Sequence, residues 1–173
     1  MSPMSRPLLL LDVDGPLIPF GGTPREYVVV RRGSNPLLAR INPDLGPLLA
    51  NLSCELVWAT AWMEEANECV GPVLGLPRLP VMAWPDTADD ADARIGLHWK
   101  TRALVDRAAG RSFIWIDDEI GDMDRLWVSA HHRGPALLHP VDSGVGLSTS
   151  DFATLTAWIG AQPDASAGSS DMS

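Results

Sequence analysis

The sequence LLLLDVDG at residues 8–15 decides the fold that we expect for this chain. Four consecutive leucines are followed at once by Asp12 and Asp14. A continuous apolar run of this length is typical of a strand buried on both faces, as in a parallel sheet that helices cover. Residues 54–60 and 112–118 have the same form, because each is an apolar run that ends in a polar side chain. Together these segments predict an α/β fold with a central, mainly parallel sheet.

Helices are expected between these strands. Asn42 and Ser150 are typical N-caps, and Gly110 is a typical C-terminal stop. Gly71 and Pro72 are expected to break the second helix near its end. The alternation predicts a three-layer, Rossmann-like sandwich with right-handed crossovers. The expected strands are residues 6–13, 54–60, 79–84, 112–118 and 136–141, and the expected helices are residues 42–52, 63–74, 99–109, 121–132 and 150–160.

Two segments fall outside this alternation. Residues 15–34 are rich in glycine and proline and include an apolar stretch at residues 27–31, which predicts a flap with a short strand after the first strand of the sheet. Residues 162–173 are small and polar, which is typical of a disordered tail. We therefore expect one domain over residues 1–161, a size that needs no disulfide or metal to fold.

Composition restricts the classes of function. The 22 acidic and 13 basic side chains give a net charge of -9, which argues against strong non-specific binding to nucleic acid, because that binding depends on basic side chains. Two cysteines are too few for a disulfide framework and fit a reducing cytoplasm. The longest apolar run is too short to span a membrane. We therefore expect a cytoplasmic protein without a membrane partner, and the oligomeric state stays open.

Polar side chains gather where the expected strands end. The chain has a single lysine among 13 basic side chains, so this lysine calls for a reason specific to its position. Ligands of open α/β sheets bind at the carboxyl ends of the strands, so these side chains are expected to meet in one site. Converging acids repel one another unless a cation neutralises them, and Mg²⁺ prefers such oxygen ligands. The set comprises Asp12, Asp14, Thr60, Asp117 and Asp118 at the strand ends, together with Lys100 at the start of the helix before the last of these strands.

The ordered set of motifs resembles the haloacid dehalogenase (HAD) superfamily of hydrolases. The first motif of that family, an apolar strand followed by DxDG, matches residues 8–15, and the second, an apolar strand ending in Thr or Ser, matches LVWAT at residues 56–60. The third motif, a lysine at a helix start, matches Lys100. The fourth, an apolar strand followed by DD or GDxxxD, matches FIWIDDEIGD at residues 113–122. Pro16 departs from the pattern, since Thr or Val is common there.

The resemblance implies a catalytic role for several of these residues. Asp12 would be the nucleophile that attacks phosphorus to give an aspartyl-phosphate, and Asp14 would be the general acid and base. A dehalogenase needs only the first acid, so Asp14 favours phosphoryl transfer over carbon–halogen cleavage. The phosphoryl group would be bound by Thr60 and Ala61 and by Lys100, which would also neutralise the nucleophile.

The resemblance also implies a Mg²⁺ site. Its ligands would be a carboxylate oxygen of Asp12, the backbone carbonyl of Asp14 and an acid of the fourth motif. Alignment with GDxxxD makes Asp118 the expected direct ligand, with Asp117 close behind it, and the choice between these two stays open.

The gaps between the motifs define the kind of HAD protein. Residues 16–42 and 61–98 are too short to fold as separate cap domains, so the chain resembles a capless member with an open site. The segments VWATAWMEEAN, HWK, WIDDE and GLSTSDFATLTAWI are similar to the HAD domain of Swiss-army-knife RNA repair proteins. The expected partner is therefore a phosphorylated substrate, either a small molecule or a polynucleotide end.

Other side chains near the motifs have simpler interpretations. Trp58, Trp62, Trp99 and Trp115 could stack on a nucleic-acid base, but packing in the core or at its rim is the preferred interpretation. The acidic residues 86–92 are interpreted as a solvated loop.

Three functions remain open at this point. The favoured one is a Mg²⁺-dependent phosphatase that acts through Asp12. The alternatives are a catalytically idle module that docks a phosphorylated partner, and a phosphotransferase that passes the phosphoryl group to another acceptor.

Overall fold

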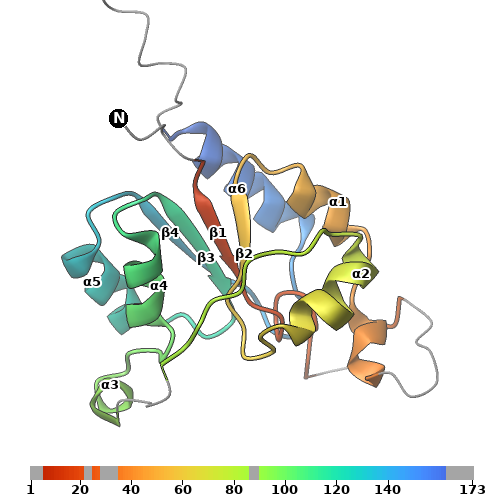
Figure 1. The fold of residues 1–173 in the computed structure, drawn as a ribbon, viewed down its shortest axis with the longest axis horizontal. Coiled ribbons are helices and arrows are strands. Elements are labelled where there is room, and N and C mark those ends of the chain that lie inside the picture. Colours follow the sequence, from red (N-terminus) through yellow and green to blue (C-terminus); the bar gives the residue numbers. More distant parts are fainter. Residues whose placement is uncertain (1–5, 22–24, 28–34, 86–89, 163–173) are drawn as a thin grey trace, which may run out of the picture.

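Four parallel strands form the centre of the fold (Figure 1). The structure is a computed structural model, which describes residues 6–21, 25–27, 35–85 and 90–162. The strands are β1 (Leu8–Leu11), β2 (Glu55–Trp58), β3 (Phe113–Asp117) and β4 (Ala136–Pro140). Their order in the sheet is β2-β1-β3-β4, and each pair of neighbours is parallel. The α/β fold with a central parallel sheet is thus confirmed.

Each expected helical interval contains a helix, with bounds that differ by a few residues, whereas the helices at residues 36–40 and 90–94 were not expected. The element η1 is a 3₁₀ helix, the element η2 is a π-helix, and the others are α-helices. They are η1 (Pro36–Arg40), α1 (Leu45–Ala50), η2 (Ala66–Val70), α2 (Gly71–Leu74), α3 (Asp90–Arg94), α4 (Thr101–Ala108), α5 (Asp122–His131) and α6 (Thr149–Gly160).

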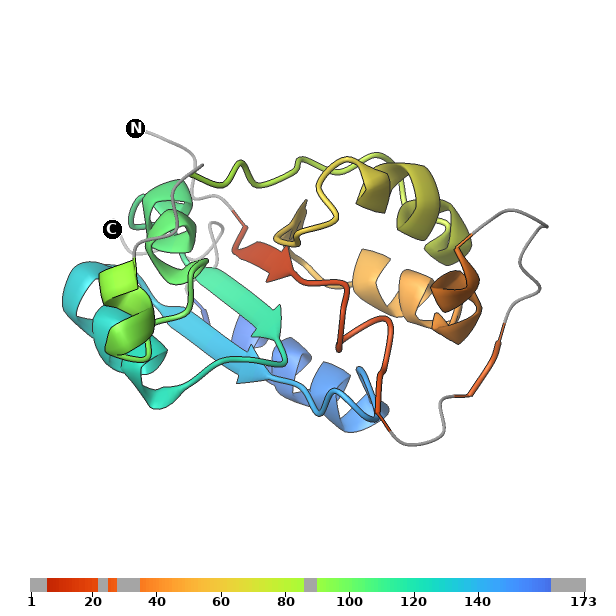
Figure 2. The ribbon, with the colours of Figure 1, turned by 90° about the horizontal axis from the view of Figure 1, so that it is seen from below.

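Helices cover both faces of the sheet because both faces of β1 are apolar. Successive side chains of a strand point to opposite faces. Leu9 and Leu11 pack in one core cluster with residues of α1, α2 and α6, whereas Leu8 and Leu10 pack in a second cluster with residues of α4 and α5. Figures 1 and 2 show these helices on the two sides of the sheet. The three-layer sandwich follows directly from the run of four leucines.

The connections of the two inner strands leave the sheet on opposite faces. The chain after β1 leads to α1 on one face, and the chain after β3 leads to α5 on the other. A crevice opens between two such strands at their carboxyl ends, and this is where ligands of open α/β sheets bind. Asp12 directly follows β1, and Asp117 is the last residue of β3. The fold therefore places the two motifs side by side at this crevice.

The segment after β1 turns back tightly on the end of that strand. The backbone N–H groups of Leu17 and Ile18 both donate to the carbonyl of Val13, and both side chains are buried. The start of the expected flap is thus packed against the core. The strand expected at residues 27–31 lies, apart from Tyr27, outside the described residues.

The helix after β2 is not broken at Gly71 and Pro72, which corrects the sequence-based expectation. The chain passes directly from η2 into α2. This helix ends at its C-cap Gly75, whose φ is 71°. Proline lacks an N–H, and its ring clashes in a regular α-helix. The wider π-helical turn before Pro72 accommodates both properties.

Asn67 ties this helix to β2 and to residues 79–84. Its Oδ1 accepts hydrogen bonds from the indole Nε1 of Trp58 and from the backbone N of Leu79, each at 2.9 Å, and its Nδ2 donates to the Leu79 carbonyl at 2.8 Å. The strand expected at residues 79–84 is instead a single bridge between Val81 and Trp58. Two backbone hydrogen bonds, from the N of Trp58 to the Pro80 carbonyl and from the N of Met82 to the Trp58 carbonyl, join this segment to β2 beside the Asn67 contacts.

The cap of the last helix is Ser148, which corrects the assignment to Ser150. The Ser148 hydroxyl accepts from the backbone N of Asp151 at 3.4 Å, and the Asp151 carboxylate accepts from the backbone N of Ser148 at 2.8 Å. This reciprocal pair is a capping box, in which two otherwise unpaired N–H groups are satisfied together. Ser150 lies within α6, two residues after the cap.

Part of the expected acidic loop is a helix instead. Residues 86–89 lie outside the described part of the chain, and the next residues form α3. Asp92 in this helix is buried and accepts from the guanidinium of Arg102 at 2.6 and 2.7 Å. A two-point contact with Arg explains why this acid can leave solvent.

Two expectations about organisation are not decided by the described residues. The domain over residues 1–161 stays a prediction, and so does the tail, because residues 163–173 lie outside the described ranges. A search of the described helices finds none with the length and apolar character that a membrane crossing requires.

We predict that Asn67→Leu lowers the free energy of unfolding by about 2–4 kcal/mol, because it leaves the buried Trp58 indole and the Leu79 backbone without their partners. Chemical denaturation measures this change. The exposed Asn51 at the end of α1 provides the control, and Asn51→Ala is expected to change stability by less than about 0.5 kcal/mol. Equal effects of the two substitutions would contradict the role given to Asn67.

Candidate active site

The ammonium group of Lys100 joins the ends of three strands. Its Nζ lies 2.7 Å from Oδ2 of Asp117, 3.1 Å from Oδ1 of Asp12 and 2.9 Å from the carbonyl oxygen of Ala59. These partners stand at or directly after the ends of β3, β1 and β2. Lys100 is only 3% exposed, so this charge lies away from solvent and is neutralised by the two carboxylates. The position of the chain's only lysine is thus explained by its role as the counter-charge of two buried carboxylates.

Strand register brings these three partners to the same level of the sheet. Leu11 pairs with Trp58 of β2 and with Ile116 of β3. The next residues along the three strands are Asp12, Ala59 and Asp117, so they also meet as neighbours. The backbone N of Asp12 donates to the Ile116 carbonyl at 3.0 Å, and the N of Ala59 donates to the Leu11 carbonyl at 2.8 Å.

The helix start that carries Lys100 is held by His98 and Asp124. The Nδ1 of His98 accepts from the backbone N of Lys100 at 3.1 Å. Asp124 is 1% exposed and accepts from the backbone N of His98 at 2.8 Å and from the hydroxyl of Thr101 at 2.7 Å. Its other oxygen accepts from the backbone N of Gly121 at 2.9 Å. Asp124 therefore fixes the N-terminal end of α4 relative to that of α5.

Three carboxylates form a cluster that could hold a metal ion. Asp12, Asp117 and Asp118 each offer an oxygen, and these atoms lie within 4.8 Å of one another. Gly15 makes the close approach of Asp118 possible, because a Cβ at Gly15 would lie 2.8 Å from the Asp118 side chain. Its φ of 100° also favours glycine. The DxDG motif therefore needs its glycine for both conformation and space.

Burial and mutual repulsion disfavour full ionisation of this cluster. The pKa of Asp12 is raised to about 7, because burial disfavours the charged form and Asp117 repels it, and these effects exceed the opposing attraction of Lys100. The pKa of Asp118 is raised to about 6. Burial has the largest effect, and a hydrogen bond with Asp117 and the negative charge of Asp117 raise the pKa further. The ammonium group contacts two of the three carboxylates, so the cluster keeps an excess of negative charge, and the residues present fit a divalent cation with oxygen ligands.

The comparison with protein families agrees with this geometry. The model of the family described as "HAD domain in Swiss Army Knife RNA repair proteins" matches residues 8–152, most of the chain. The chain belongs to this family. No curated protein and no solved structure matches the chain. The resemblance to the HAD superfamily, and to this branch of it, is thereby confirmed.

An open cavity of about 160 Å³ lies at the HAD motifs, at the carboxyl end of the sheet. Six of the seven residues that the sequence suggested for catalysis, substrate binding or metal binding line it. They are Asp12, Asp14, Ala61, Lys100, Asp117 and Asp118. The seventh, Thr60, does not line it, because its side chain is fully buried and its hydroxyl accepts from the backbone N of Trp62 at 3.1 Å. The roles of Thr60 and Ala61 in substrate binding stay predictions.

Asp14 stands apart from the three-carboxylate cluster. Its side chain is half-buried, and its Oδ2 accepts a hydrogen bond from the indole Nε1 of Trp62 at 3.1 Å. The sequence predicts that the backbone carbonyl of Asp14, and not its side chain, binds the metal. The cluster consists of side-chain oxygens, so this role of Asp14 stays a prediction. The sequence suggested Trp62 only as a stacking candidate, so its contact with Asp14 went unrecognised.

Tryptophans that look alike in the sequence have different positions around the site. Trp58 and Trp115 are fully buried, so neither can stack on a ligand. Trp99 is 46% exposed and lines the cavity, and Phe20, which the sequence did not indicate, lines it as well. Trp84 packs edge-on against Trp99, with ring centroids 4.9 Å apart. An aromatic rim therefore borders the carboxylate cluster.

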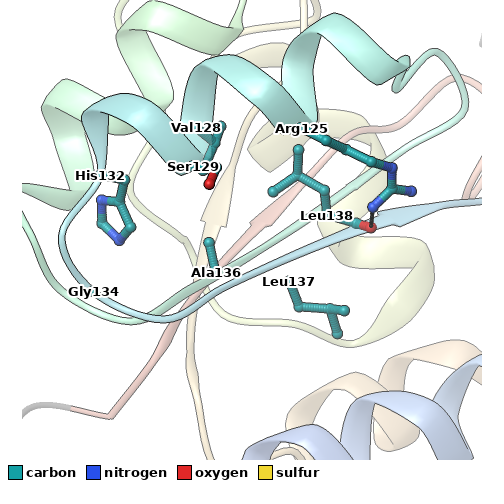
Figure 3. Close-up of a pocket in the computed structure, with 8 residues that line it drawn as sticks. All are labelled: Arg125, Val128, Ser129, His132, Gly134, Ala136, Leu137 and Leu138. Atoms are coloured by element: carbon teal, nitrogen blue, oxygen red, sulfur yellow. Dashed lines mark hydrogen bonds between the residues drawn. The ribbon is translucent and has the colours of Figure 1, made fainter.

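A second cavity of about 370 Å³ lies between α5 and β4 (Figure 3). Figure 3 shows Arg125 reaching across it, and the Arg125 guanidinium donates to the Leu138 carbonyl at 3.2 Å. None of the eight residues that line this cavity is acidic. It therefore offers no carboxylate as nucleophile or metal ligand, although it is larger than the cavity at the HAD motifs.

We predict that Lys100→Gln destabilises the protein by about 3 kcal/mol at pH 8, because it leaves the buried Asp12 and Asp117 without a counter-charge. The loss is expected to be smaller at about pH 5, where the carboxyl groups can take up protons. Urea denaturation at the two pH values measures this. A loss independent of pH would contradict the electrostatic role of Lys100.

A second prediction concerns pH and added Mg²⁺. The folded-state pKa values of Asp12 and Asp118 are raised, so their contribution to stability is present below about pH 4 and is lost as the pH rises through about 6 to 7. Mg²⁺ binds the charged carboxylates, so it should raise the melting temperature at about pH 8 but hardly at about pH 5.

Two variants test where this Mg²⁺ acts. Asp118→Asn should reduce the Mg²⁺-dependent rise in melting temperature, because it removes one carboxylate of the cluster. Asp106→Asn changes an exposed acid on α4 and should leave the rise unchanged. A rise that survives Asp118→Asn in full would contradict the proposed metal ligands.

Proposed function

We propose that the chain is a Mg²⁺-dependent phosphatase that hydrolyses phosphate monoesters through an aspartyl-phosphate on Asp12. The observation that carries this proposal is the contact of Lys100 with both Asp12 and Asp117 beside a cavity. A carboxylate nucleophile needs nearby positive charge, because it must approach an anionic phosphoryl group. Lys100 supplies this charge at 3.1 Å from Oδ1 of Asp12.

The first step transfers the phosphoryl group to the protein. A carboxylate oxygen of Asp12 attacks phosphorus, and the bond between phosphorus and the leaving-group oxygen breaks. Asp14 gives its proton to that oxygen, so the alcohol departs neutral and Asp14 becomes a carboxylate. Lys100 stays protonated and stabilises the charge on the transferred group.

The second step returns the protein to its starting state. Asp14 takes a proton from water as the water attacks phosphorus, and the bond between phosphorus and the Asp12 oxygen breaks. Inorganic phosphate leaves, Asp12 is a carboxylate again, and Asp14 carries the proton for the next cycle. One residue thus acts as acid and then as base.

The cluster residues suggest how a metal ion would assist. Asp12, Asp118 or Asp117, and the backbone carbonyl of Asp14 would hold Mg²⁺, which supplies positive charge for the phosphoryl group when it is bound. The raised pKa values of Asp12 and Asp118 support this, because a nearby cation would offset the burial and the repulsion from Asp117 that raise them.

The proposed substrate is a phosphorylated polynucleotide end or nucleotide. The described residues contain no separate cap domain between the motifs, so the cavity is open. The name of the family points to RNA repair, and the net charge of -9 argues for recognition of an end at the site rather than along a strand. A cytoplasmic location fits this task.

We predict that Asp12→Asn lowers the turnover of p-nitrophenyl phosphate with Mg²⁺ by about a thousandfold or more, because the amide cannot act as the nucleophile. Release of p-nitrophenol measures the rate, and acid-quenched mass spectrometry detects the phosphorylated protein. Asp106→Asn is the control and should keep the wild-type rate.

The same assay separates the alternatives. If wild type and Asp12→Asn are equally inactive on p-nitrophenyl phosphate, nucleotides and phosphorylated RNA ends, the phosphatase proposal is wrong and a binding module is favoured. If added alcohols yield new phosphoesters in place of phosphate, the chain is a phosphotransferase.

A further inference from the structure

The indole of Trp62 links the two strand ends that carry the second motif and the proposed acid and base. Asp14 follows β1, and Trp62 follows β2. The Trp62 Nε1 donates to Oδ2 of Asp14 at 3.1 Å, across 48 positions of sequence. Neither the nucleophile nor the metal cluster requires this contact, so it needs its own explanation.

The turn that carries Trp62 combines a side-chain hydrogen bond with a strained backbone position. The backbone N of Trp62 donates to the hydroxyl of Thr60 at 3.1 Å, which closes a local turn. The next residue, Met63, has a φ of 54°, a left-handed conformation that costs a residue other than glycine about 1 kcal/mol or more. Met63 is 38% exposed, so burial of its own side chain does not explain this strain.

The strained turn is explained by the position that it gives to Trp62. The indole is half-buried and packs against the core cluster that includes Leu9 and Leu11, so the ring is fixed. Its N–H points at Asp14, which lines the cavity. Strained backbone that a surrounding structure maintains is often found where function requires a fixed geometry.

The chemistry of the indole determines which oxygen of Asp14 is free. An indole N–H can only donate a hydrogen bond, so Oδ2 must accept it. The proton that a general acid gives away is then carried by Oδ1. We propose that Trp62 is a positioning residue, which holds Asp14 so that Oδ1 exchanges the proton with the leaving group and with water. This proposal rests on the phosphatase function proposed above.

The leaving group distinguishes positioning of the acid from simple packing. Phenolate is a far more basic leaving group than p-nitrophenolate, so phenyl phosphate depends more strongly on a proton from Asp14. The two substrates are nearly equal in shape. The ratio kcat/KM covers only the steps up to loss of the leaving group, so hydrolysis of the shared aspartyl-phosphate does not enter the comparison.

The test compares Trp62→Phe with wild type on both substrates. Phenylalanine keeps an aromatic ring in the core contact but removes the N–H. We expect kcat/KM to fall about tenfold more for phenyl phosphate than for p-nitrophenyl phosphate, a part of the usual contribution of a general acid. Equal losses on the two substrates would overturn the proposal, because a packing defect does not discriminate between leaving groups.

Trp84 provides a matched control. It is also half-buried beside the site, and its Nε1 donates one hydrogen bond at 3.1 Å, but the acceptor is the carbonyl of Thr60. Trp84→Phe should therefore lower kcat/KM by the same factor for both substrates. A leaving-group effect in Trp84→Phe as large as in Trp62→Phe would also overturn the proposal.

A second measurement tests the contact without any turnover. Trp62→Phe assigns the Trp62 indole N–H signal in a proton–nitrogen NMR spectrum of the whole chain. Asp14→Ala should move this signal upfield and speed its exchange with solvent, whereas the Trp84 signal should keep its position. An unmoved Trp62 signal would overturn the proposal whatever the kinetics show.

The two measurements separate failure of this inference from failure of the phosphatase function. The phosphatase proposal itself fails if Asp12→Asn has the same turnover as wild type. In that case the NMR result still shows whether Trp62 binds Asp14, but the positioning role falls with the reaction. Where turnover depends on Asp12 and the leaving-group ratio is unchanged in Trp62→Phe, only the inference is wrong.

Discussion

A buried ammonium group surrounded by the ends of three parallel strands is the interaction on which this structure depends. Lys100 contacts Asp12, Ala59 and Asp117, and the pairing of β1 with both of its neighbours brings these residues to one level. Removing the ammonium group would leave two carboxylates without a counter-charge in a place that water hardly reaches. The same contact holds the carboxyl ends of the strands together and places a positive charge beside the proposed nucleophile. The fold and the proposed chemistry therefore depend on the same atoms.

The sheet could be predicted from the sequence because its signals are local. The run at residues 8–11 is apolar at every position, so both faces had to be covered. One error arose where a distant partner decides. The side chain of Asn67 satisfies the backbone at Leu79, and residues 79–84 form only a single bridge to β2 instead of the expected strand. The cap at Ser148 was missed although its signal, an acid three residues later, is present in the sequence.

The candidate site was predicted to the level of its motifs, and its surroundings were not. Order along the chain was enough to group Asp12, Lys100 and Asp117, because parallel strands end at one edge. Burial cannot be read from residue type, so Trp58 and Trp99 looked equivalent, yet one lies in the core and the other at the rim. Contacts between such side chains depend on register and on turn geometry, which composition and spacing do not encode.

The elevated proton affinity of Asp12 has an evolutionary consequence. A carboxylate kept in a dry, crowded place works against folding, so the chain carries an instability that only its proposed reaction justifies. A descendant relieved of that reaction gains stability when it replaces this acid with a neutral residue of similar volume. Natural members of the family that lack this acid should therefore have a higher free energy of unfolding than those that retain it.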